Sequence, residues 1–243
     1  MFQKTGIYTY TIDAYLCDFK GQAPLPMLGG FMLQVATKHA EERGFGFNSM
    51  SGQKRAWVLS RMAIEIYEYP KNDTTIKLHT WVSDVNKIFT ERCFAFENEE
   101  RKMIGYARSV WASIDLETRR PTNVLELEGL TEYNTGEACP IEGMKKILPV
   151  KEADSVSSFD VKYSDIDINK HLNSMKYIEH YVDRFDIGMF KEKEIRRFEI
   201  NYIQEAHYGS NLDILKKEES DGIFVLELRN GDAIVSNARI TWK

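Results

Sequence analysis

The segment DIDINKH, residues 165–171, places acidic, amide and imidazole groups at alternate positions. The groups with this spacing are Asp165, Asp167, Asn169 and His171. Alternate oxygen-bearing side chains can converge on one cation, so calcium binding is the first chemistry to consider. A calcium loop also needs Gly at its sixth position and Glu at its twelfth, where this chain has Lys170 and Lys176. We therefore do not predict a calcium site, and another use for these residues is needed.

A helix is predicted directly after this segment. Residues 171–188 keep apolar side chains at helical spacing and reach a stop signal at Gly188. The apolar face consists of Leu172, Met175, Ile178, Val182 and Phe185. An Asn just before a helix is a common N-cap, so capping is one interpretation of Asn169 and catalysis is the other.

Strand patterns fill most of the remaining sequence. Residues 57–69 and 74–82 are predicted to form paired strands joined by the turn-like PKND, and residues 87–115 a long hairpin. The C-terminal part repeats this order. Residues 194–219 predict two strands separated by a Gly-containing turn, and residues 222–243 predict a hairpin with an Asn-Gly turn.

The two halves of the chain also match residue by residue. RMAIEIYEY, from Arg61, aligns with RFEINYIQE, from Arg197, and ARSVW, from Ala107, aligns with ARITW, from Ala238. A helical pattern precedes each strand set, and the first covers residues 26–46. The sequence therefore predicts two copies of an α+β unit, each a long helix packed on an antiparallel sheet. Joining the two sheets edge to edge would cover exposed strand edges.

The repeat sets the expected organisation of the chain. We assign residues 1–115 to the first unit and residues 151–243 to the second. Residues 116–150 contain Pro, Gly, Asn and Thr in a long connection, so we assign them to a linker that is ordered against the surface or functional.

The order of a strand, a D-x-N-x-H motif, a helix and four strands resembles the acyl-acyl-carrier-protein thioesterases, which are tandem hot-dog proteins. The core of the resemblance is DIDINKHLNSMKYI, residues 165–178, which is similar to that family's D-L-D-x-N-x-H-x-N-N-x-K-Y-I signature. The resemblance implies two tandem hot-dog units and hydrolysis of fatty acyl-acyl carrier protein to free fatty acid and carrier protein, which ends fatty acid synthesis. It implies neither a cofactor nor a metal ion.

The resemblance places Asp167, Asn169 and His171 on the family's catalytic triplet and Glu205 on its catalytic glutamate. The family has a cysteine after that glutamate, once proposed as a nucleophile, whereas this chain has Ala206. We therefore expect activated water to attack the thioester, with Glu205 as the base. Asn169 and free amides at the helix N-terminus would bind the oxyanion, and His171 would position or deliver a proton. Asp167 would orient Asn169 or fix the His171 tautomer.

The first half keeps the shape of the unit without this chemistry. GQAPLPMLGG, ahead of its helix, contains no Asp, Asn or His, and Tyr69 stands where the second half has Glu205. The start of this helix contains small and flexible apolar residues, namely Met27, Gly29, Gly30, Phe31 and Met32. Lining of an acyl-chain pocket is one interpretation of them, and ordinary core packing is the other.

Three of the four histidines outside the motif need an assignment. His39 and His180 lie mid-helix among charged residues, so we expect both to be solvated. His207 follows Glu205 by two residues, and it could assist catalysis or lie at the surface of a strand end.

Composition restricts the partners. The 243 residues carry a formal net charge of −5, so no global field attracts nucleic acid. No segment reaches the roughly 18 apolar residues of a membrane span, and the N-terminus lacks the apolar core of a signal peptide. The three cysteines show no C-x-x-C spacing. We therefore expect a cytoplasmic protein without stable membrane insertion.

The expected partner is an acyl carrier protein with a phosphopantetheine-linked acyl chain. Such carriers are acidic, so docking would need a local basic patch, with candidates in residues 191–197, Lys145, Lys146 and the pair Arg119 and Arg120. Two chains could also associate as a homodimer.

Other functions fit the same motif. An acyl-coenzyme A thioesterase shares the phosphopantetheine arm of the substrate. A hydratase or dehydratase on the same fold would have no need for Asn169. In a non-catalytic acyl-binding protein, these residues would only cap a helix.

Overall fold

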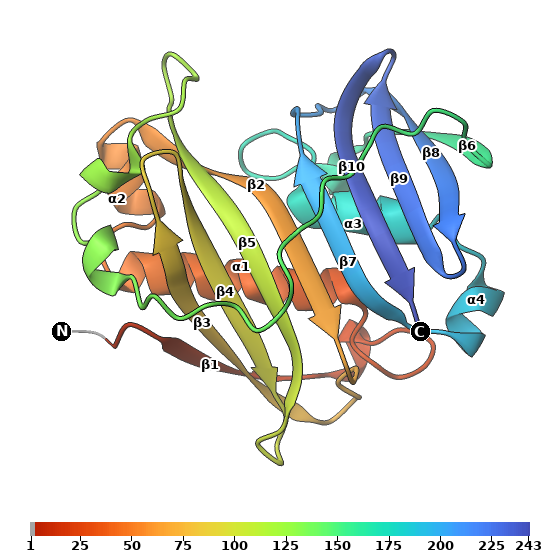
Figure 1. The fold of residues 1–243 in the computed structure, drawn as a ribbon, viewed down its shortest axis with the longest axis horizontal. Helices are drawn as coiled ribbons and strands as arrows, with labels where there is room; N and C mark the ends of the chain where they lie inside the picture. The colour runs from red at the N-terminus through yellow and green to blue at the C-terminus, as the bar shows by residue number, and fades with distance from the viewer. Residues whose placement is uncertain (1–2) are drawn as a thin grey trace. The chain divides into compact units, whose positions relative to one another are not determined.

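Each half of the chain folds as a helix lying along an antiparallel sheet, as the repeat predicts (Figure 1). The computed structural model describes residues 3–243. Two compact units divide the chain, Met1–Gly143 and Met144–Lys243. Within the described residues, no helix combines the length and the apolar composition that crossing a membrane requires.

The sheet of the first unit has the strand order β1-β3-β4-β5-β2, with antiparallel neighbours. Its strands are β1 (Gly6–Thr11), β2 (Arg55–Ile66), β3 (Thr75–Val85), β4 (Phe89–Glu97) and β5 (Met103–Asp115). Its helices are α1 (Leu25–Glu42) and the short α2 (Phe47–Gly52). Leu28, Met32 and Val35 on one face of α1 are 0% exposed, so the apolar side of the helical pattern at residues 26–46 is the packed face.

The second unit repeats this arrangement with the order β6-β8-β9-β10-β7. Its strands are β6 (Ser155–Asp160), β7 (Ile195–Tyr202), β8 (Asn211–Ser220), β9 (Ile223–Asn230) and β10 (Ala233–Trp242). Its helices are α3 (Ser174–Val182) and α4 (Ile187–Glu192). The predicted hairpin at residues 222–243 is confirmed, because Asn230 pairs with Ala233 around Gly231, which has a φ of 58°.

The predicted pairing of residues 57–69 with 74–82 is wrong. β2 pairs with β5, whereas β3 lies between β1 and β4. The PKND segment is therefore a crossover rather than a hairpin turn, and its Pro70 carbonyl accepts a hydrogen bond from the Ala23 N–H ahead of α1 at 2.8 Å. A hairpin pattern in sequence does not reveal this, because pairing depends on distant partners.

The helix predicted at residues 171–188 is two shorter helices. The Asn173 side chain accepts the Met175 N–H at 2.8 Å, so α3 begins at Ser174. The Asp186 side chain accepts the Gly188 N–H at 2.7 Å and begins α4. The N-caps Asn173 and Asp186 thus start two helices in a segment whose apolar spacing predicts one.

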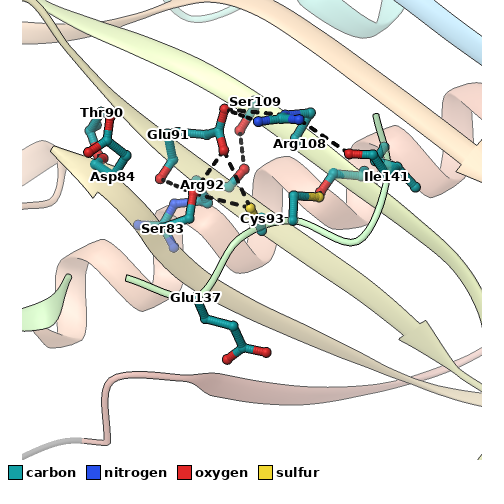
Figure 2. A network of polar contacts seen from close by, with 12 residues as sticks. Ser83, Asp84, Thr90, Glu91, Arg92, Cys93, Arg108, Ser109, Glu137 and Ile141 are labelled. Carbon is teal, nitrogen blue, oxygen red and sulfur yellow. Dashed lines mark hydrogen bonds and ion pairs between the residues drawn. The ribbon is translucent and has the colours of Figure 1, made fainter. Parts of the chain in front are cut away.

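The connection between the strand sets is ordered against the first unit over much of its length. It contains two short 3-10 turns, Val124–Glu126 and Leu130–Tyr133. Beyond them, Trp81 Nε1 donates to the Glu137 carbonyl at 2.9 Å, and Arg108 Nη1 donates to the Ile141 carbonyl at 3.2 Å. Figure 2 shows Glu91 binding Arg108, with the Oε2 to Nη2 distance 2.5 Å, so a half-buried ion pair holds the side chain that anchors this connection.

His39 is buried rather than solvated, which corrects the expectation from its charged neighbours. Its side chain is 0% exposed, with Nδ1 3.1 Å from Arg92 Nη1 and Nε2 3.0 Å from the Lys4 carbonyl oxygen. A guanidinium can only donate, so Nδ1 accepts and Nε2–H donates, which makes the ring neutral. Burial, followed by the charges of Arg92 and Arg43, lowers the pKa of His39 from 6.5 to about 3.

We expect this histidine to make the first unit sensitive to acid. The unfolded chain protonates residue 39 near pH 6.5, whereas the folded chain protonates it only near pH 3. The stabilisation from neutral His39 is therefore complete above pH 6.5 and is lost as the pH falls toward 3, at up to about 1.4 kcal/mol per pH unit. A His39→Gln variant can make both hydrogen bonds without titrating. Its midpoint of urea unfolding should change less than that of wild type between about pH 7 and about pH 5. Equal changes would contradict the assignment.

Candidate active site

The loop ahead of α3 closes on itself instead of running extended. Ile166 pairs with Leu172 in an antiparallel bridge, and the Asp167 N–H donates to the His171 carbonyl at 2.9 Å. Lys170 has a φ of 66°, in the left-handed region that reverses the chain. The four alternating polar groups therefore do not share one side, because Asn169 is exposed while Asp165 is buried.

Asp165 is a structural residue of this loop. Its carboxylate accepts the Lys162 N–H at 2.8 Å and lies 3.6 Å from His180 Nε2. The His180 ring stacks on Phe159 with centroids 3.7 Å apart, and burial lowers the pKa of His180. His180 is thus packed against the unit, contrary to the expectation that it is solvated.

Asp167 acts on the backbone of the loop. Its Oδ1 accepts the N–H of Asn169 at 2.8 Å and the N–H of His171 at 3.2 Å. Both bonds reach the main chain rather than the Asn169 amide or the His171 ring. Asp167 therefore fixes the path of the loop that presents these two side chains.

The amides near the start of α3 are occupied. Each N–H from Asn169 to Asn173 donates within the protein, to acceptors on Asp167, Asp165 or Ala206. The cap of α3 is Asn173, so Asn169 is not the capping residue. Residues 169–173 therefore offer no free amide, and the exposed Asn169 side chain is a candidate donor to an oxyanion.

Glu205 lies in the loop that follows β7, not within the strand. β7 ends at Tyr202, and the N–H groups of Ile203 and Gln204 both donate to the Val235 carbonyl where the chain leaves the sheet. The Leu172 N–H then donates to the Ala206 carbonyl at 2.8 Å, which ties this loop to the loop of Asp167.

Ala206 separates two exposed side chains that lie close to His171. It is 1% exposed, whereas its neighbours Glu205 and His207 are both exposed. The side chain at position 206 thus packs inward, where even a thiol would be covered. The three cysteines of this chain belong to the first unit, and the candidate residues belong to the second.

His171 and Glu205 lie within reach of proton transfer between their side chains. The distance from His171 Nε2 to Glu205 Oε2 is 3.3 Å, and their side chains are 25% and 42% exposed. An imidazole and a carboxylate at this separation can share a proton and remain open to water. The ring of His207 meets that of His171 edge to face, with centroids 5.0 Å apart. The E-x-H spacing was the only sequence signal for His207 near this pair.

Tyr177 contacts the loop that carries Glu205. It is 4% exposed on α3, and its hydroxyl donates to the Gln204 carbonyl at 3.4 Å. Burial raises the pKa of Tyr177, and the nearby charges of Glu205 and Asp167 add to this shift. Tyr177 therefore stays neutral and connects the helix to the loop of Glu205. The sequence pattern identified it only as a helical residue.

The first unit contains a copy of the same loop, which the sequence alignment did not reveal. The Asp18 N–H donates to the Gln22 carbonyl at 2.9 Å, and Asp18 Oδ1 accepts the N–H of Lys20 at 2.8 Å and of Gln22 at 3.3 Å. Gly21 has a φ of 69°, matching Lys170. Asp18 therefore makes the same bonds as Asp167.

The reactive groups are replaced in this copy. Lys20 stands in place of Asn169 and Gln22 in place of His171, while the bond from Ala23 to Pro70 repeats the one from Leu172 to Ala206 at the same 2.8 Å. Tyr69, ahead of Pro70, then occupies the place of Glu205, as the alignment predicted. The loop geometry and its aspartate thus persist where the other three groups do not.

The chain matches family models in both halves. The model for the acyl-ACP thioesterase N-terminal domain matches residues 4–131, and the model for the C-terminal domain matches residues 149–243. A chloroplastic acyl-[acyl-carrier-protein] hydrolase of Cuphea viscosissima is 26% identical to this chain over an alignment of 254 residues. The alignment covers 97% of this chain and 61% of that protein. A chloroplastic oleoyl-acyl carrier protein thioesterase 2 of Arabidopsis thaliana is 24% identical over 250 residues, which cover 95% and 67%.

Solved structures show the same fold. An acyl-ACP thioesterase from Bacteroides thetaiotaomicron superposes with a TM-score of 0.94 at 38% identity, covering 99% of this chain and 98% of that one. A 12:0-ACP thioesterase from Umbellularia californica superposes with a TM-score of 0.91 at 19% identity, covering 100% and 98%. The family matches include both loops of the site and their copy in the first unit. This chain therefore belongs to the acyl-ACP thioesterase family.

Proposed function

We propose that this protein hydrolyses fatty acyl-acyl carrier protein to free fatty acid and carrier protein, at the end of fatty acid synthesis. The observation that carries the proposal is the His171–Glu205 pair, 3.3 Å apart and open to water, within the match to the family's C-terminal domain. The names of the plant relatives supply the carrier-bound substrate.

In this mechanism Glu205 is the base. It takes a proton from water as the water oxygen attacks the thioester carbonyl carbon. Negative charge develops on the carbonyl oxygen, which accepts a hydrogen bond from the Asn169 side-chain amide. The backbone N–H groups of residues 169–173 already donate within the protein, so they do not take this role. Collapse of this intermediate breaks the carbon–sulfur bond, and His171 passes the proton that Glu205 took from water, across their 3.3 Å contact, to the departing thiolate.

Asp167 has a different task in this scheme. Both of its hydrogen bonds hold the backbone that presents Asn169 and His171. The equivalent Asp18 makes the same bonds where the other groups of the site are replaced. We therefore assign Asp167 as a positioning residue.

The first unit is non-catalytic in this proposal, because Lys20, Gln22 and Tyr69 offer no carboxylate and imidazole pair. Met32 is 0% exposed and Phe31 stacks on Tyr10 with centroids 4.4 Å apart, so these two residues pack within the unit. An acyl-chain pocket near the start of α1 stays a prediction, as do a homodimer and a cytoplasmic location.

The carrier docking surface also stays a prediction. Of the basic candidates, Arg197 is held by Glu199, with Nη2 2.6 Å from Oε1, so it is less available to an acidic partner. Salt-sensitive preference for a protein-bound substrate would support docking by exposed charge.

Release of free thiol from acyl-acyl carrier protein and acyl-coenzyme A thioesters tests the activity. We expect turnover that prefers the carrier protein and falls by at least about 100-fold in His171→Ala and Glu205→Gln, because each removes a proton-transfer group. Asn169→Ala should lower kcat by about 100-fold to 1,000-fold through loss of the oxyanion donor.

Glu179→Gln is a matched control for Glu205→Gln. The Glu179 side chain is 41% exposed, against 42% for Glu205, and it pairs with Lys176 on α3 away from the pair. It should keep wild-type turnover. Wild-type turnover in Glu205→Gln would contradict the role of Glu205 as the base that activates water. Faster turnover of acyl-coenzyme A than of acyl-acyl carrier protein would contradict the proposed substrate.

Asp167→Asn tests the positioning role. One amide oxygen can still accept both N–H groups, so this variant should keep turnover within about tenfold of wild type and an unchanged pH profile. Asp167→Ala should lose turnover and about 1 to 3 kcal/mol of stability. Asp18→Ala should lose similar stability while keeping turnover. Collapse of turnover in Asp167→Asn would instead make this carboxylate a catalytic group.

A further inference from the structure

Three potential metal ligands meet at the site. His171, Glu205 and His207 each offer one ligand atom, and these atoms all lie within 4.8 Å of one another. His171 is half-buried, whereas Glu205 and His207 are exposed. The mechanism proposed above uses His171 and Glu205 but gives His207 no task.

The backbone holds this cluster in place before any ion arrives. Buried Ala206 lies between Glu205 and His207, and its carbonyl is fixed by the N–H of Leu172, the residue after His171. His207 begins a tight turn, because its carbonyl accepts the Ser210 N–H at 3.1 Å. The three side chains thus come from two loops, and the hydrogen bond that joins these loops lies one residue away from each of the three.

Two imidazoles and one carboxylate are the ligand set of a zinc-type ion. In a tetrahedral site with bonds of about 2.0 to 2.1 Å, neighbouring ligand atoms lie about 3.3 Å apart. The distance from His171 Nε2 to Glu205 Oε2 is already 3.3 Å. Magnesium and calcium prefer oxygen ligands, so two imidazoles select against them.

We propose that His171, Glu205 and His207 form a binding site for a divalent transition metal ion of the zinc class, and that binding reversibly blocks hydrolysis. The metal would take up the carboxylate and the imidazole that must exchange protons with water and thiolate. The inhibitory part rests on the proposed thioesterase function, whereas the binding part does not.

Titration of metal-stripped protein with Zn²⁺ by calorimetry, and with Co²⁺ by absorption spectroscopy, tests binding without any substrate. We expect one site per chain, with affinity reduced at least about tenfold in His207→Ala. His79→Ala is the matched control. His79 Nε2 lies 2.9 Å from Glu97 Oε2 in the first unit, so it offers an imidazole and carboxylate pair without the second imidazole. Its loss should leave the affinity unchanged.

Turnover of an acyl thioester tests inhibition. Zn²⁺ should lower wild-type turnover, a chelator should restore it, and whatever turnover His207→Ala retains should be insensitive to Zn²⁺. Absence of binding, or equal binding by wild type and His207→Ala, would overturn the site. Turnover that rises with Zn²⁺ would overturn inhibition. Absence of hydrolysis on every thioester would refute the proposed function, while the calorimetry would still decide the metal site.

Discussion

One backbone hydrogen bond, from the Leu172 N–H to the Ala206 carbonyl, determines the geometry of the site. It joins a loop ahead of α3 to a loop after β7, segments that lie more than thirty residues apart in sequence. Because His171 precedes one end of this bond and Glu205 and His207 flank the other, a 2.8 Å contact between main-chain atoms brings three side chains together. A main-chain bond depends little on side-chain identity, so the reactive groups can change while the frame persists.

The first unit shows what that frame needs. Its loop keeps the aspartate, the left-handed residue and the bond between loops, although its Lys20, Gln22 and Tyr69 differ from the second unit. The hydrogen bonds of such a carboxylate to two backbone N–H groups together stabilise the loop by about 1 to 3 kcal/mol. Asp18 therefore stabilises its loop without taking part in any reaction, and Asp167 stabilises the equivalent loop in the same way.

The sequence predicted the elements better than their connections. The apolar stripe of α1 and the hairpin at Asn230 depend on local spacing, so they could be read directly. The pairing of β2 with β5 depends on distant strands, and the start of α3 depends on which of Asn169 and Asn173 caps it. The burial of His39 was missed because its neighbours in sequence are charged, whereas its contacts in space are Arg92 and the Lys4 carbonyl. The motif named Asp167, Asn169, His171 and Glu205, but it could not assign which groups contact the backbone.

The occupied amides change where stabilisation of an oxyanion can come from. A helix N-terminus with free N–H groups would be a rigid donor, whereas the N–H groups of Leu172 and Asn173, just ahead of α3, already donate to the Ala206 and Asp165 carbonyls. In the proposed mechanism the donor is the exposed side chain of Asn169, whose loop is held by Asp167. A flexible side chain stabilises charge well only when its backbone is fixed, because ordering it in the transition state costs entropy. In the proposed mechanism Asp167, which accepts two N–H groups of this loop, supplies that rigidity, so the group that orders the site is separate from the groups that react.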